Sequence, residues 1–185
     1  MVLSISGPSS TGKTTLINKL KELYPQYNYI DEFFREIVKE QISFDDPERS
    51  FLFQCDLCLK MPSPIFNINF VYIMDRCAYD YIVYTSLHFY RLPDELKKQY
   101  ISKYVESILY CRYLLQNVNC IFLTHADDRS IENDNFRPTI YNELRAEEIN
   151  LFSTLIDSVN KKYCFLPNDI DNQIFTIENF IKREL

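Results

Sequence analysis

Short apolar runs alternate along the chain with longer segments in which apolar residues recur every three or four positions. The short runs predict five β-strands, at residues 2–6, 27–30, 70–74, 120–124 and 163–166. The longer segments predict helices at residues 13–23, 33–41, 47–61, 77–90, 93–116, 139–161 and 170–184. Strands that alternate with helices predict a parallel sheet between two helical layers, with right-handed crossovers.

Local signals support several of these elements. The run at residues 70–74 is apolar at nearly every position, which is typical of a strand covered by helices on both faces. Asp46 and Pro47 predict a helix start, because aspartate caps helices and proline fits the first helical position. With 185 residues, 46% of them hydrophobic, the chain is expected to form a single domain over residues 1–185.

The composition excludes several classes of protein. Glycine occurs only as Gly7 and Gly12, so there is no GxGxxG dinucleotide fingerprint and no Asp-x-x-Gly switch of the GTPase kind. The six cysteines include a CxxC, Cys55 and Cys58, but no second pair of ligands stands at zinc spacing. We interpret the cysteines as small buried apolar residues rather than as a disulfide framework or metal site.

Charge and hydropathy bear on partners and location. No apolar run approaches the roughly 18 residues that span a bilayer, and the start of the chain lacks the features of a signal peptide. We therefore expect a soluble, cytoplasmic protein with no membrane association. The net charge of −6 argues against holding duplex DNA by bulk electrostatics, although a local basic groove or a small anionic ligand remains compatible with it.

The most specific motif is a phosphate-binding loop. Residues 7–14 read GPSSTGKT, which matches GxxxxGK[ST] between a predicted strand and a predicted helix. Backbone N–H groups of such a loop face phosphates, Lys13 reaches the β and γ oxygens, and the Thr14 hydroxyl can ligate Mg²⁺. The cofactors expected are therefore ATP and Mg²⁺. The residues expected to hold them are Gly7, Ser9, Ser10, Thr11, Gly12, Lys13, Thr14 and Thr15.

Charged residues follow the second and third predicted strands, where a parallel α/β sheet binds its ligands. Asp31 and Glu32 are candidates for the base that takes the acceptor's proton, with Glu32 preferred, and Arg35 could face the same cleft. Asp75 could hold Mg²⁺ through its waters, and Arg76 could contact a phosphate. The alternative in each case is an ordinary ion pair without a functional role.

Two further features are candidates for substrate contact or closure. Tyr79 and Asp80 could line the acceptor pocket, or be a core tyrosine and a solvated aspartate. The charged stretch at about residues 125–138 is interpreted as a lid that brings Arg137 over the phosphates and excludes water. The alternative is a solvated loop.

Taken together, these motifs resemble those of the nicotinamide-riboside-kinase-like branch of P-loop kinases, over nearly the whole chain. The matching patterns are Glu-x-x-Arg at residues 32–35, Asp-Arg at 75–76, and an Asp-Gly-x-Arg lid motif at 134–137 in which Asn135 replaces glycine. Asparagine also enters left-handed backbone conformations, so the replacement is compatible with the motif. The resemblance implies a three-layer P-loop NTPase fold and an ATP-dependent kinase.

The chain is also similar to deoxynucleoside and thymidylate kinases, to polynucleotide kinases and to phage enzymes that phosphorylate hydroxymethylated pyrimidines in DNA. Three hypotheses follow. The first is a kinase that acts on a nucleoside- or nucleotide-like small molecule. The second is a kinase that acts on hydroxymethylated bases or ends of DNA, and the third is a non-kinase NTPase switch or binding module.

Overall fold

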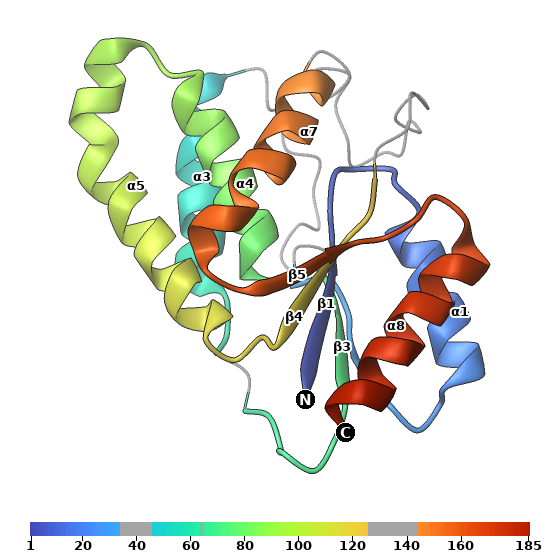
Figure 1. Cartoon of the computed structure of the whole chain (residues 1–185). Helices are drawn as coiled ribbons and strands as arrows, with labels where there is room; N and C mark the ends of the chain where they lie inside the picture. The colour runs from blue at the N-terminus through green and yellow to red at the C-terminus, as the bar shows by residue number, and fades with distance from the viewer. Residues whose placement is uncertain (34–45, 64, 126–143) are drawn as a thin grey trace.

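Five parallel strands form the centre of the molecule (Figure 1), in the order β2-β3-β1-β4-β5. The computed structural model describes residues 1–33, 46–63, 65–125 and 144–185. The strands are β1 (Val2–Ser6), β2 (Asn28–Ile30), β3 (Tyr72–Asp75), β4 (Cys120–Leu123) and β5 (Lys162–Phe165). The predicted five-stranded parallel sheet is confirmed.

Helices cover both faces of the sheet, which gives the three-layer arrangement that the sequence predicts. In Figure 1, α1 and α8 lie on one side, and α3, α4, α5 and α7 lie on the other. Their bounds are α1 Lys13–Leu23, α3 Pro47–Lys60, α4 Ala78–Tyr90, α5 Asp94–Leu115, α7 Arg145–Thr154 and α8 Ile170–Glu184. The helix predicted at residues 33–41 falls largely outside the described residues.

Two predicted elements differ from the structure by more than one residue. The third strand starts at Tyr72 rather than at residue 70, because its ladder begins where Val2 pairs with Tyr72, and Phe70 is half exposed beyond that point. The single helix predicted at residues 139–161 is not continuous. α7 ends at Thr154, a 3₁₀ helix follows at Ile156–Val159, and Asn160 then takes the left-handed conformation (φ 50°) that stops it.

The hydrophobic core lies on both faces of the central strands. Alternate residues of β4 point to opposite sides, so that Ile121 packs with α4 and α5 while Phe122 packs with α1 and α8. Asp46 caps α3 as expected, since its carboxylate accepts hydrogen bonds from the backbone N–H groups of Glu48 (2.9 Å) and Arg49 (3.2 Å). None of the helices that the structure describes is both long and apolar enough to cross a membrane.

Candidate active site

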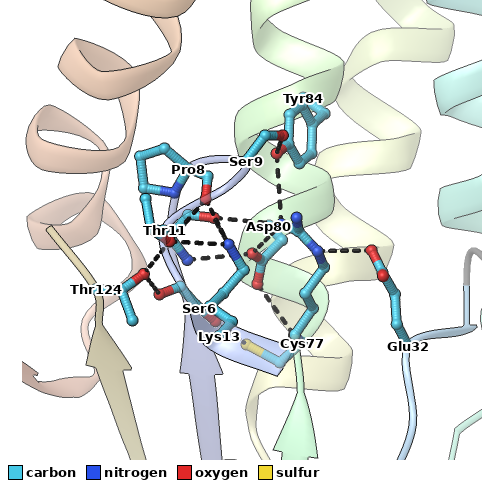
Figure 2. A network of polar contacts seen from close by, with 12 residues as sticks. Ser6, Pro8, Ser9, Thr11, Lys13, Glu32, Cys77, Asp80, Tyr84 and Thr124 are labelled. Carbon is cyan, nitrogen blue, oxygen red and sulfur yellow. Dashed lines mark hydrogen bonds and ion pairs between the residues drawn. The ribbon is translucent and has the colours of Figure 1, made fainter. Parts of the chain in front are cut away.

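The residues singled out after the first and third strands meet at one edge of the sheet, and Thr124 joins them there. The loop at residues 7–12 follows β1, Asp75 and Arg76 close β3, and Thr124 follows β4. Because β1 pairs with both β3 and β4, these three segments are neighbours in space. Figure 2 shows polar groups of Pro8, Thr11, Asp80 and Thr124 around Lys13.

The backbone of the phosphate-binding loop turns through left-handed conformations. Gly7 (φ 138°) and Gly12 (φ 81°) have positive φ angles, which favour glycine. Ser10 also has a positive φ angle (53°). Gly12 is the N-cap of α1, and no side chain among the described residues caps that end. The first N–H groups of α1 are therefore available to an anion, which fits a nucleotide phosphate.

Gly7 is also required for close packing. A Cβ atom built at this position would lie 2.4 Å from Thr124 Oγ1 and 2.9 Å from the Thr124 carbonyl oxygen, whereas one at Gly12 would meet nothing within 4 Å. Gly7→Ala should therefore lower the free energy of unfolding by about 2–4 kcal/mol, from overpacking plus backbone strain. Gly12→Ala should cost only about 1–2 kcal/mol, from strain alone.

The measurement is chemical denaturation of both variants without nucleotide. Equal losses in the two variants would contradict the close approach of Gly7 to Thr124.

Lys13 lies inside the loop rather than in solvent. Its ammonium group donates hydrogen bonds to the carbonyl oxygens of Gly7 (2.9 Å) and Pro8 and to Thr11 Oγ1 (3.2 Å), and its side chain is 5% exposed. Burial, with a smaller contribution from the Arg76 charge, lowers the pKa of Lys13 to about 7. An anion in the loop would restore the charged form.

The pKa of Lys13 has a consequence for nucleotide binding. Above pH 7 the free protein holds mostly the neutral amine, and phosphates favour the ammonium form, so binding should take up a proton. The affinity for ATP should then fall by up to about tenfold per pH unit above pH 7. Calorimetry at pH 8 in two buffers with different ionisation enthalpies measures the uptake. Lys13→Arg, which does not titrate in this range, should show none, and equal behaviour of both proteins would contradict the role of Lys13.

Arg76 is the centre of the charged network. Its Nε lies 2.6 Å from Glu32 Oε1, and its Nη1 lies 2.9 Å from Asp80 Oδ1 and 3.3 Å from the Gly7 carbonyl oxygen. Burial alone would lower the pKa of Arg76, but the neighbouring carboxylates and Tyr84 raise it well above its ordinary value. Arg76 also has φ 67°, a left-handed conformation that is costly for a residue with a side chain.

The three candidate carboxylates have different surroundings. Glu32 is mostly buried, with 11% of its side chain exposed, and faces Arg76, whereas Asp31 is exposed and pairs with Lys21 of α1 at 2.8 Å. Asp75 is buried at the end of β3, and burial raises its pKa, an effect that Arg76 opposes and Glu32 adds to. Glu32 is thus the carboxylate held against the guanidinium beside the loop, whereas Asp31 lines the cavity next to Asp75.

Asp80 and Tyr79 are both buried. Asp80 accepts hydrogen bonds from the backbone N–H groups of Gly7 (3.3 Å) and Cys77 (3.1 Å), so it ties the start of the loop to the start of α4. The Tyr79 hydroxyl donates to the carbonyl oxygen of Phe152 (2.6 Å) in the core. Tyr79 therefore lies in the core, as the alternative interpretation has it, and Asp80 is not solvated but holds Arg76 and the loop. A contact of either side chain with substrate stays a prediction.

Three residues of the network escaped the sequence analysis. The Tyr84 hydroxyl donates to Glu148 Oε1 (2.7 Å), Glu148 accepts the backbone N–H of Ser9 (2.7 Å), and Arg145 donates to the carbonyl oxygen of Ser9. The signal was the Arg-x-x-Glu spacing of residues 145 and 148, which places both side chains on one face of a helix. Their contact with the loop is tertiary, and periodicity alone does not reveal it.

An apolar cavity of about 80 Å³ adjoins Asp75 and Arg76. Its wall is rich in aromatic and sulfur-containing side chains, which pack well against flat ring systems. The wall includes Phe33, Met61, Phe66, Met74, Cys77 and Tyr81.

The remaining expectations concern Arg35, the lid, the cysteines and a metal site. Arg35, Arg137 and nearly all of the proposed lid lie outside the described residues. Cys55 and Cys58 are buried free thiols in the core beside α4 and α5. In the part of the chain that the structure describes, no group of three or more His, Cys, Asp or Glu side chains could hold a metal ion.

Known proteins share this fold. The sequence matches the family described as AAA domain over residues 2–172, and no curated protein matches it significantly. A deoxyadenosine kinase from M. mycoides with bound dATP superposes with a TM-score of 0.69 at 16% identity, over 98% of this chain and 100% of that chain. The YorR protein from Bacillus subtilis, in complex with phosphorylated GDP, gives 0.55 at 15%, over 100% and 97%.

The NadR protein in complex with NR is also similar, with a TM-score of 0.53 and 22% identity over 89% of this chain but 44% of that chain. At these identities the likeness shows the fold and not the substrate. The three-layer fold of P-loop kinases is therefore confirmed, while membership of the nicotinamide-riboside-kinase-like branch stays a prediction.

Proposed function

The chain belongs to the AAA domain family, and we propose that it is a kinase that transfers the γ-phosphoryl group of ATP to a nucleoside- or nucleotide-like acceptor. The observation that carries the proposal is the ion pair between Glu32 and Arg76, 2.6 Å long, formed directly beside the phosphate-binding loop. A phosphate-binding loop by itself would serve an NTPase switch equally well. A carboxylate held by a buried guanidinium at the same edge of the sheet gives the reaction an acceptor side.

The donor side is formed by the loop and the start of α1. Lys13 exchanges its carbonyl partners for the β and γ oxygens of ATP, and the uncapped N–H groups of α1 hold the phosphates. The exposed Thr14 hydroxyl and the buried Asp75 carboxylate, the latter through water, are the groups that would hold Mg²⁺. Magnesium, when bound, neutralises charge on the phosphates.

The acceptor side is formed by Glu32 and Arg76. A hydroxyl group of the acceptor lies near Glu32 and passes its proton to the Glu32 carboxylate. The hydroxyl oxygen attacks the γ-phosphorus at the same time, and ADP leaves. Arg76 orients Glu32 through their ion pair, and its guanidinium keeps its charge because neighbouring groups raise its pKa well above the ordinary value. Arg137, in the segment proposed as a lid, would add positive charge over the transferring group.

The acceptor class is inferred from the surroundings of that pair. The cavity beside Asp75 and Arg76 is lined by Phe33, Phe66 and methionines, a composition suited to a flat ring that widens the space on entry. Structures with the same fold include a deoxyadenosine kinase from M. mycoides and a thymidylate kinase from Candida albicans, the latter with a TM-score of 0.63 at 15% identity. Both support a nucleoside or nucleotide as acceptor.

The test is phosphoryl transfer from γ-labelled ATP with Mg²⁺ to a panel of nucleosides, nucleoside monophosphates, nicotinamide riboside and oligonucleotides with and without hydroxymethylated pyrimidines. Labelling of a nucleoside or nucleotide supports the proposal. Labelling of oligonucleotides alone would replace it by the DNA-kinase alternative, in which Arg35 and Arg76 would face the strand. Arg76 already pairs with two carboxylates, so the described part of the cleft adds little free positive charge for DNA.

A further inference from the structure

Helix α7 binds one residue of the phosphate-binding loop, Ser9, at both its backbone N–H and its carbonyl oxygen. The backbone N–H of Ser9 donates to Glu148 Oε1 (2.7 Å), and Arg145 Nη1 donates to the Ser9 carbonyl oxygen. Glu148 is completely buried, and the side chain of Arg145 is 14% exposed. A buried carboxylate is costly unless it is compensated. The hydrogen bonds fall on Oε1, and Oε2 is compensated by the Arg145 guanidinium at 3.5 Å.

Tyr84 of α4 connects Glu148 to the acceptor side. Its hydroxyl donates to Glu148 Oε1 (2.7 Å), which leaves its two lone pairs for Ser9 Oγ (3.0 Å) and Arg76 Nη1 (3.4 Å). Burial above all raises the pKa of Tyr84 well above its ordinary value, so the phenol keeps its proton. Figure 2 shows Tyr84 beside Ser9 and above Asp80.

The contacts form a continuous path from α7 to the candidate base. The path runs from Glu148 to Tyr84, from Tyr84 to Arg76, and from Arg76 to Glu32. The second branch, from Glu148 to Ser9, ends on the loop that binds the donor. Both branches start on the same carboxylate oxygen, so a shift of Glu148 displaces the donor side and the acceptor side together.

We propose that Glu148, supported by Arg145, is a positioning residue that fixes the distance between the phosphate-binding loop and the Glu32–Arg76 pair. The proposal rests on the proposed kinase function, because only a two-substrate reaction needs both sides held in register. Misplacement of reacting groups by about 1 Å can lower a rate by roughly 10²-fold. A residue that touches neither substrate can therefore control transfer.

The chain offers a matched control in the neighbouring residue. Glu147 has the same chemistry on the same helix but is exposed, so Glu147→Ala and Glu147→Gln change the charge of α7 without touching the loop. Glu148→Ala removes both branches of the path. Glu148→Gln keeps an oxygen for Ser9 and Tyr84 but sets an amide against Arg145, and Tyr84→Phe keeps the ring while it removes the link between the branches.

The experiment measures the ATP dissociation constant with and without saturating acceptor, and the transfer rate, for each purified variant. We expect Glu148→Ala and Tyr84→Phe to lower the transfer rate by roughly 10- to 100-fold. We also expect them to abolish any effect of acceptor on ATP affinity, because a coupling between two sites disappears when the path that carries it is cut. Glu147→Ala should match the wild type in both measurements.

A merely structural role for Glu148 would lower the melting temperature but leave the acceptor effect on ATP affinity intact in the folded fraction, and that result would overturn the proposal. Wild-type rates in Glu148→Ala and Tyr84→Phe would overturn it as well. If the wild type transfers phosphate to no acceptor, the kinase function fails. Weaker ATP binding in Glu148→Ala but not in Glu147→Ala would in that case still support positioning of the loop.

Discussion

Replacement of Lys13 by alanine is expected to lower phosphoryl transfer by roughly 10²–10³-fold, the usual loss when a preorganised charged donor is removed from a transfer site. Lys13 carries the only side-chain ammonium group that the described residues place inside the loop. Folding should survive the change, because the deletion also removes a buried group whose pKa of about 7 shows that its charge is poorly solvated.

The measurement is the rate of label transfer from ATP at saturating acceptor, together with the ATP dissociation constant. Lys19→Ala is the matched control, since Lys19 lies on the same helix, is half exposed and forms only a surface pair with Glu22. A transfer rate of Lys13→Ala within a factor of a few of the wild-type rate would show that the loop takes no part in the reaction.

Replacement of Glu32 by glutamine is expected to lower the transfer rate by about 10²–10⁴-fold while ATP affinity stays nearly unchanged. The amide is close in shape to the carboxylate but cannot take a proton, and it weakens the bond to Arg76 Nε. The loss should therefore fall on the rate constant and not on donor binding.

Asp31→Asn is the control for this variant, because Asp31 is the adjacent residue and pairs with Lys21 at the surface. We expect wild-type transfer from it. The reverse result, with Asp31→Asn inactive and Glu32→Gln active, would exchange the roles of the two carboxylates. Equal and small losses of transfer rate in both variants would leave Asp75 as the candidate base.

Sequence reasoning succeeded where local pattern determines structure. The bounds predicted for α8 match the structure, because its apolar residues recur with helical periodicity and Asp169 caps it. The phosphate-binding loop could be placed because its glycines and Lys13 stand at fixed spacing between a strand and a helix. The strand order could not be read in this way, since it depends on which crossovers pack together.

The parts of the site that were missed depend on tertiary contacts. Asp80 could be singled out from the sequence only as a candidate for the acceptor pocket, and its bonds to Arg76 and to the start of the loop appear only in the folded structure. Glu148 and Tyr84 lie 64 positions apart in the chain and meet at Ser9. Helical periodicity predicts which face of a helix is buried, but not which polar groups that face contacts.

The central claim is that the loop and the Glu32–Arg76 pair form two halves of one transfer site. Its most direct test is the rate of ADP formation from Mg²⁺-ATP with and without the acceptor that the transfer panel identifies. The account predicts that acceptor raises ADP formation at least about tenfold, with one labelled acceptor molecule for each ADP. ADP formed at the same rate with and without every acceptor, and label found only in free phosphate, would contradict it and favour an NTPase switch.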